Sequence, residues 1–78
     1  MPVKILSPID YKAARKIIRW VGIGVLPKQS DAELLLEIVK SFDTDQTSSI
    51  REVAEQINHR HLASQETCKI AEIQLNLL

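Results

Sequence analysis

Four cations near the start of the sequence form its clearest group of chemically active side chains. They are Lys12, Arg15, Lys16 and Arg19. The last three lie three, four and seven residues after the first, so all four fall on one face of a helix. Such a face neutralises phosphates of a nucleic acid in a salt-dependent way, or it binds an acidic protein. The alternative is a solvated face that pairs in part with acidic residues farther along the chain. Those residues are Asp31, Glu33 and Glu37.

Residues 49–75 resemble a helix-turn-helix unit. Residues 49–57 are similar to its supporting helix, and residues 63–68 to the start of its recognition helix, where small polar side chains approach base edges. The resemblance implies that Gln65 reads an adenine and that Lys69 reaches a phosphate or a guanine. The candidate contact residues on the second helix are Ser64, Gln65, Thr67 and Lys69. The connection over 58–62 is longer than the usual turn and has no glycine, so plain helical packing is the competing interpretation.

Residues 42–50 resemble the opening of an EF-hand calcium loop. Asp43 and Asp45 would occupy its first and third positions. The loop needs glycine at position six and a bidentate glutamate at position twelve, where this chain has Ser48 and Ala54. We therefore expect an inter-helix linker, and a degenerate divalent-metal sensor is the alternative.

Metal and catalytic motifs find little support elsewhere. His59, His61 and Cys68 match no zinc spacing, so no metal site is predicted and Cys68 is expected in the core. No nucleophile elbow and no glycine-rich phosphate loop is present. The sequence thus predicts a non-enzymatic protein without a cofactor.

The last nine residues are unusually apolar for a chain end. The candidates for a self-association surface there are Ile73, Leu75, Leu77 and Leu78. Chain ends fray unless they dock, so this segment either closes the core or contacts a second copy. Association would supplement the thin core of a small domain, which favours a homodimer.

Helix start and stop signals divide the chain into four helices, at about 8–21, 31–42, 49–59 and 64–75. The expected N-caps are Ser7, Ser30, Ser49 and Ser64. Gly22 and Gly24, followed by Pro27, end the first helix. The predicted fold is an all-α bundle. One short strand pair, between residues 3–6 and 73–77, is the alternative at the termini.

Length and composition set the remaining limits. The chain has 78 residues, room for one helical domain over 1–78. Its formal net charge is zero, which does not favour a nucleic-acid partner. Its single cysteine favours the cytoplasm, and no apolar run is long enough to span a bilayer, so no membrane partner is expected.

The sequence as a whole is not identified as a member of a known family. Its amphipathic helices and apolar end predict a small regulatory or interaction module that acts through protein–protein contacts, as a homo-oligomer. The alternatives are the nucleic-acid-binding regulator and the metal sensor.

Overall fold

The computed structural model describes residues 7–42 and 45–78, which form four α-helices and a short 3-10 helix. The elements are α1 (Pro8–Gly22), α2 (Gln29–Phe42), η1 (Asp45–Thr47), α3 (Ser48–Asn58) and α4 (Gln65–Leu77). No strand occurs within these two ranges, and the predicted all-α bundle is confirmed. Because α4 includes residues 73–77, the C-terminal strand alternative is wrong. Its expected partner, residues 3–6, lies outside the described residues.

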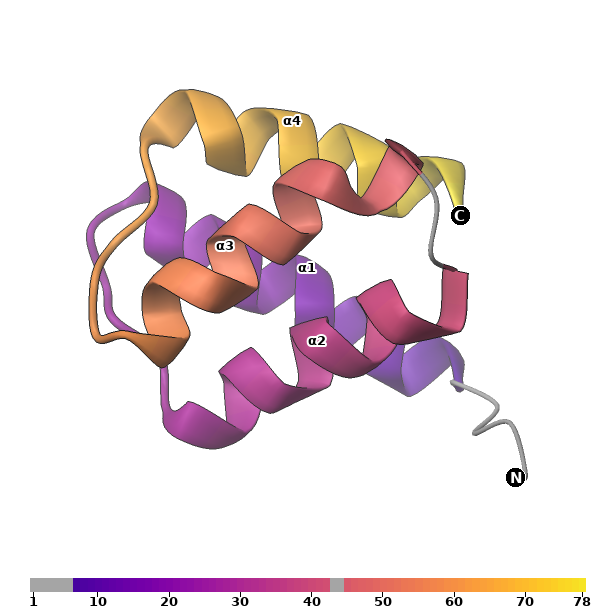
Figure 1. Cartoon of the computed structure of the whole chain (residues 1–78), viewed down its shortest axis with the longest axis horizontal. Helices are drawn as coiled ribbons and strands as arrows, with labels where there is room; N and C mark the ends of the chain where they lie inside the picture. The colour runs from indigo at the N-terminus through magenta and orange to yellow at the C-terminus, as the bar shows by residue number, and fades with distance from the viewer. Residues whose placement is uncertain (1–6, 43–44) are drawn as a thin grey trace.

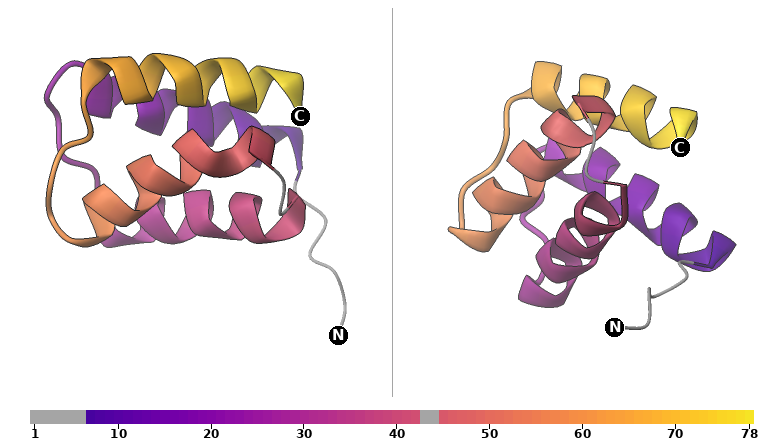
Figure 2. Two further views of the ribbon diagram at one scale, coloured as in Figure 1. Left: turned by 45° about the horizontal axis from the view of Figure 1, so that its top comes forward. Right: turned by 45° about the vertical axis from the view of Figure 1, so that its right-hand side comes forward.

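Successive helices run in alternating directions (Figure 1). Helix α3 packs between α2 and α4, and α4 also packs on α1, whereas α1 and α2 make fewer contacts with each other. The α1–α2 and α3–α4 connections lie side by side at one end of the bundle (Figures 1 and 2). There Arg60 Nη1 donates to the Pro27 carbonyl at 3.2 Å. Helix α1 is therefore held to the rest of the bundle mainly through α4.

The core is built from one apolar stripe on each helix. The stripes of the first and third helices are buried; they are Ala14, Ile17, Ile18 and Val21, and Ile50, Val53, Ala54 and Ile57. Helix α2 adds Ala32, Leu35, Ile38 and Val39, and α4 adds Cys68, Ala71 and Leu75. Each large aliphatic side chain buried in this way contributes roughly 1.5–3 kcal/mol, so apolar burial dominates the stability of the bundle.

Two of the four predicted N-caps are confirmed. The Ser7 hydroxyl accepts from the Asp10 N–H at 3.3 Å, and the Asp10 carboxylate accepts from the Ser7 N–H at 2.9 Å. The Ser64 hydroxyl accepts from the Thr67 N–H at 3.1 Å. Both caps satisfy donors that the first turn of a helix leaves without an intrahelical partner.

The other two predicted caps are wrong, for different reasons. Helix α2 begins one residue before Ser30, and the Asp31 carboxylate reaches back to accept from the Lys28 N–H at 3.1 Å. Helix α3 begins at Ser48, so the Ser49 side chain lies inside the first turn. The backbone N–H of Ser49 instead donates to Oε1 of Gln74 at 2.9 Å. Gln74 lies near the C-terminal end of α4. A neighbouring helix thus caps α3, which local sequence does not reveal.

The same hydrogen-bond pattern closes α1 and α3. The Val25 N–H donates to the Trp20 carbonyl at 2.9 Å, and the His61 N–H donates to the Gln56 carbonyl at 2.8 Å. The pattern requires a left-handed residue just past the helix end. Gly24 provides it after α1, with φ of 90°, and Arg60 provides it after α3, with φ of 63°.

We predict that Gln74→Ala destabilises the protein by about 1 kcal/mol, the usual cost of losing a cap. The half-buried Ser49 N–H would lose its acceptor. Urea denaturation measures the change, with Gln65→Ala, an exposed substitution on the same helix, as the control. Equal midpoints for the two variants would show that the Gln74 contact contributes nothing.

Candidate functional site

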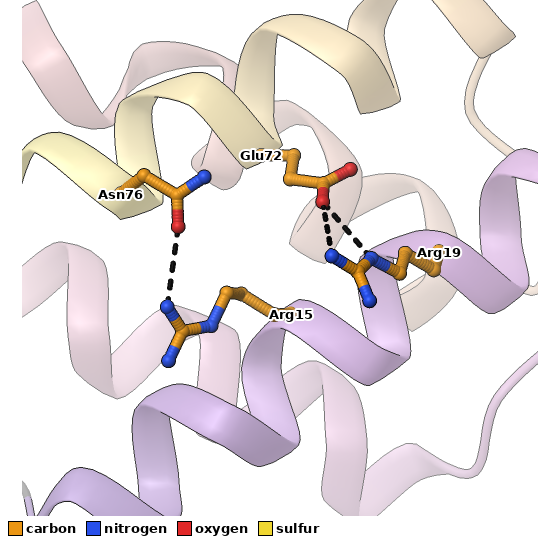
Figure 3. Close-up of polar contacts among 4 residues, drawn as sticks. All are labelled: Arg15, Arg19, Glu72 and Asn76. Atoms are coloured by element: carbon orange, nitrogen blue, oxygen red, sulfur yellow. Dashed lines mark hydrogen bonds and ion pairs between the residues drawn. The ribbon is translucent and has the colours of Figure 1, made fainter.

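Two of the four cations on the predicted face of α1, Arg15 and Arg19, contact α4. Arg19 donates from Nε and Nη2 to Oε1 of Glu72, both at 2.9 Å. One turn earlier, Arg15 Nη1 donates to Oδ1 of Asn76 at 3.2 Å (Figure 3). The acidic partner of Arg19 is therefore on α4, and the pairing expected with acids of the second helix is wrong for this arginine.

These two contacts orient α4 more than they stabilise it. The Arg19 side chain is 68% exposed and that of Glu72 is 30% exposed. An ion pair so open to solvent contributes roughly 0.2–1 kcal/mol. The pair and the Arg15–Asn76 bond join the two helices at two successive turns, and thereby fix which residues of α4 face α1.

The other two cations of the predicted face remain open to solvent. Lys12 and Lys16 are exposed, and with Arg19 and Trp20 they line a shallow hollow of about 330 Å³. The Lys16 ammonium lies 5.2 Å from the centre of the Trp20 ring, within cation–π range. These lysines are available to a partner without breaking a cross-helix bond.

The predicted contact residues of α4 fall into two pairs. The hydroxyls of Ser64 and Thr67 lie 2.8 Å apart and belong to the helix cap, so their first role is local. Gln65 and Lys69 are exposed and line a hollow that Arg19 also lines. The cationic face of α1 and the start of α4 therefore adjoin on one surface. The sequence alone could not show whether the two share a surface.

This hollow between α1 and α4 has a volume of about 450 Å³. Its apolar walls are formed by Ile18, Gly22, Ile23 and Cys68. Polar and charged residues of both helices form the rest of the lining. They are Arg19, Gln65, Lys69 and Glu72. Cys68 is buried, as predicted, and desolvation raises the pKa of its thiol. The thiol is therefore neutral at physiological pH and a poor nucleophile.

The structure separates the four predicted self-association residues. Leu75 is only 3% exposed, and Leu78 packs against the core, so both help to close it. Ile73 and Leu77 are 60% and 66% exposed. Ile70, another of the apolar residues among the last nine, is 42% exposed. The spacing of three and then four residues places Ile70, Ile73 and Leu77 on one face of α4. We call Ile70, Ile73 and Leu77 the outer stripe of α4.

The expected calcium-loop pattern is only partly within the described residues. Its first position, Asp43, lies outside them. Asp45 begins η1, and α3 starts at Ser48, so the second half of the pattern is helical. In the described part of the chain, no group of three or more potential ligand residues is placed to hold a metal ion.

Within residues 7–42 and 45–78, every helix is too short or too polar to cross a bilayer. Compared with protein-family models, curated proteins and solved structures, the chain gives no significant match. The roles of its residues therefore rest on the geometry described above.

We predict that the stability of the protein falls as the pH rises above the ordinary thiol value, about 8.5. The raised pKa of Cys68 means that the unfolded chain loses its thiol proton first, which favours unfolding at high pH. Cys68→Ala removes this contribution. Urea midpoints of both proteins, measured at about pH 7 and pH 9, test the effect. An equal loss in the two proteins would contradict it.

Proposed function

We propose that this chain is a small non-catalytic interaction module that acts through protein–protein contacts, with the outer stripe of α4 as its contact surface and a second copy as its partner. The observation that carries the proposal is the exposure of three large aliphatic side chains in one row. Contiguous exposed apolar surface on a small protein marks interaction sites.

Helix α4 is apolar on two opposite faces. Its inner face consists of Cys68, Ala71 and Leu75, and these residues are smaller on average than those of the outer stripe. An amphipathic surface helix normally has polar residues opposite its core face. Helix α4 departs from that pattern because its larger aliphatic side chains face away from the core, and a partner would bury them.

The outer stripe suits an antiparallel contact with itself. Its members lie three and then four residues apart, so the stripe is centred near residue 73. A twofold axis at that point places Ile70 of one copy opposite Leu77 of the other and brings the two Ile73 side chains together. Such a contact uses the same patch on both copies and closes at two.

Electrostatics does not oppose this pairing. Gln74 and Asn76, beside Ile73 and Leu77 on α4, are uncharged. Glu72, which precedes Ile73, is paired with Arg19, and Glu66, on the first turn, falls beyond the end of the antiparallel overlap. The formal net charge of zero removes overall repulsion between copies. Three side chains make a small patch, so the contact belongs to the weak class that buries under ~1,200 Å² in total. The proposal places the module in the cytoplasm, which is supported by the single, buried thiol.

We predict a reversible monomer–dimer equilibrium in sedimentation over ~0.01–1 mM protein, the range suited to a weak interface. Ile73→Glu should abolish the dimer, because it places two carboxylates together at the twofold axis. The side chain is 60% exposed, so the fold should persist.

Ile9→Glu is the matched control for that variant. Ile9 is 77% exposed and lies in the first turn of α1 rather than on α4. The Ile9→Glu variant should dimerise as the unmodified protein does. A chain that stays monomeric throughout the range, or a dimer that Ile9→Glu dissociates and Ile73→Glu does not, would contradict the proposal.

The second candidate function is nucleic-acid binding by the surface that α1 and the start of α4 share. One observation favours it: Gln65 and Lys69 line the same hollow as Arg19, so base-reading and phosphate-binding groups adjoin. The pairing of Arg19 with Glu72 and the zero net charge weigh against it.

If this second function holds, a labelled random DNA duplex should bind at ~50 mM salt and dissociate at ~200 mM. Lys12→Glu combined with Lys16→Glu should then lower affinity at least about tenfold, since each reversal removes a phosphate contact. Fluorescence anisotropy measures the binding. Lys40→Glu, an exposed reversal at the end of α2, is the control. No binding at low salt would exclude this function.

A further inference from the structure

The hollow between α1 and α4 has the size and lining of a small-molecule site. Its volume of about 450 Å³ falls within the range of about 300–1,000 Å³ that such sites occupy. Ile18, Gly22 and Cys68 contribute apolar surface to it, and Arg19, Lys69 and Glu72 contribute charge. Ligand sites commonly combine mostly apolar walls with a few charged groups.

Gly22 keeps this hollow open. It is the last residue of α1, and its backbone does not adopt the left-handed conformation that would demand glycine. A Cβ atom at this position would lie 3.6 Å from the Cβ of Cys68, in ordinary contact. Any longer side chain would extend into the space that lies over Cys68. Gly22 therefore matters for the open space over Cys68, and the backbone turn does not require it.

The charged residues around the hollow favour an anion. Arg19 and Lys69 contribute two positive charges and Glu72 one negative charge, which leaves an excess of one positive charge. Within the described residues, the side chain of Lys69 forms no ion pair or hydrogen bond. The end of α1 and the start of α4 meet here, so their opposite end charges offset each other. Selectivity for charge thus depends on the side chains.

We propose that this hollow binds a small organic monoanion, a carboxylate on an apolar body. The apolar body lies over Gly22 and Cys68, and the carboxylate lies between Arg19 and Lys69. The site uses none of the three side chains of the outer stripe, although Lys69 borders both surfaces, so it does not depend on the proposed self-association.

Titration of the full chain with octanoate, followed by amide chemical shifts, tests the site, with octanol as the uncharged control ligand. We expect octanoate to shift the amides of Gly22, Cys68 and Lys69 and to bind up to about fivefold more tightly than octanol, as one exposed charge interaction allows. It should also slow alkylation of Cys68. Shifts centred on the outer stripe, equal affinity for the two ligands, or no binding would overturn the proposal.

Substitutions test separately the contribution of the charged side chains and that of the space next to Gly22. Lys69→Gln should weaken octanoate binding and leave octanol binding unchanged, whereas Glu72→Gln should strengthen octanoate binding because a competing carboxylate is lost. Gly22→Leu should block both ligands. Lys40→Gln, an exposed substitution in the last turn of α2 and outside the hollow, should change neither. Lys69→Gln is an exposed substitution that the fold tolerates, so insensitivity of octanoate binding to it would overturn the proposal even if Gly22→Leu failed to fold.

Discussion

The bundle depends on how α4 is rotated against its two neighbours. Its small residues, Cys68 and Ala71, face the core together with Leu75. Burial of Leu75 contributes roughly 1.5–3 kcal/mol, more than the ~0.2–1 kcal/mol of the exposed Arg19–Glu72 pair. Apolar burial therefore holds α4 in place, and the polar contacts select its rotation. Because α1 makes fewer contacts with α2 than with α4, the position of α1 follows from that of α4.

That rotation satisfies polar groups on both sides of α4 at once. Glu72 and Asn76 meet the arginines of α1, and Gln74 caps α3 from the opposite side. Turning α4 to bury Ile70, Ile73 and Leu77 would separate these partners and leave the Ser49 N–H without its acceptor. The apolar outer stripe is thus a consequence of the contacts that position the helix, and so is the hollow over Cys68.

Sequence periodicity was sufficient for much of the fold. The stripes of α1 and α3, the caps at Ser7 and Ser64 and the end of α1 at Gly22 depend on neighbours within a few residues, so local patterns predict them. The cap of α3 by Gln74 joins residues 25 positions apart, and no local pattern contains it. The predicted cap at Ser30 is wrong because α2 begins at Gln29 and the Asp31 carboxylate accepts from the Lys28 N–H before it.

The candidate surfaces were predicted less completely, for a related reason. Helix α4 has two apolar stripes at helical spacing, and sequence alone does not say which one faces the core. Leu75 and Leu77 were therefore grouped together, although one is buried and the other exposed. The meeting of Lys69 with Arg19 around one hollow depends on the packing of α1 against α4, which only the three-dimensional arrangement defines.

The most direct test of the central claim is the distance between spin labels on two copies of the chain. A label at Lys69→Cys, in a Cys68→Ala background, lies beside the outer stripe, whereas one at Glu33→Cys lies on the exposed surface of α2. An antiparallel α4 contact predicts a short, narrow distance distribution between copies for position 69 and a longer one for position 33. A featureless decay at position 69, or a shorter distance at position 33, would contradict the assignment of the outer stripe as the contact surface.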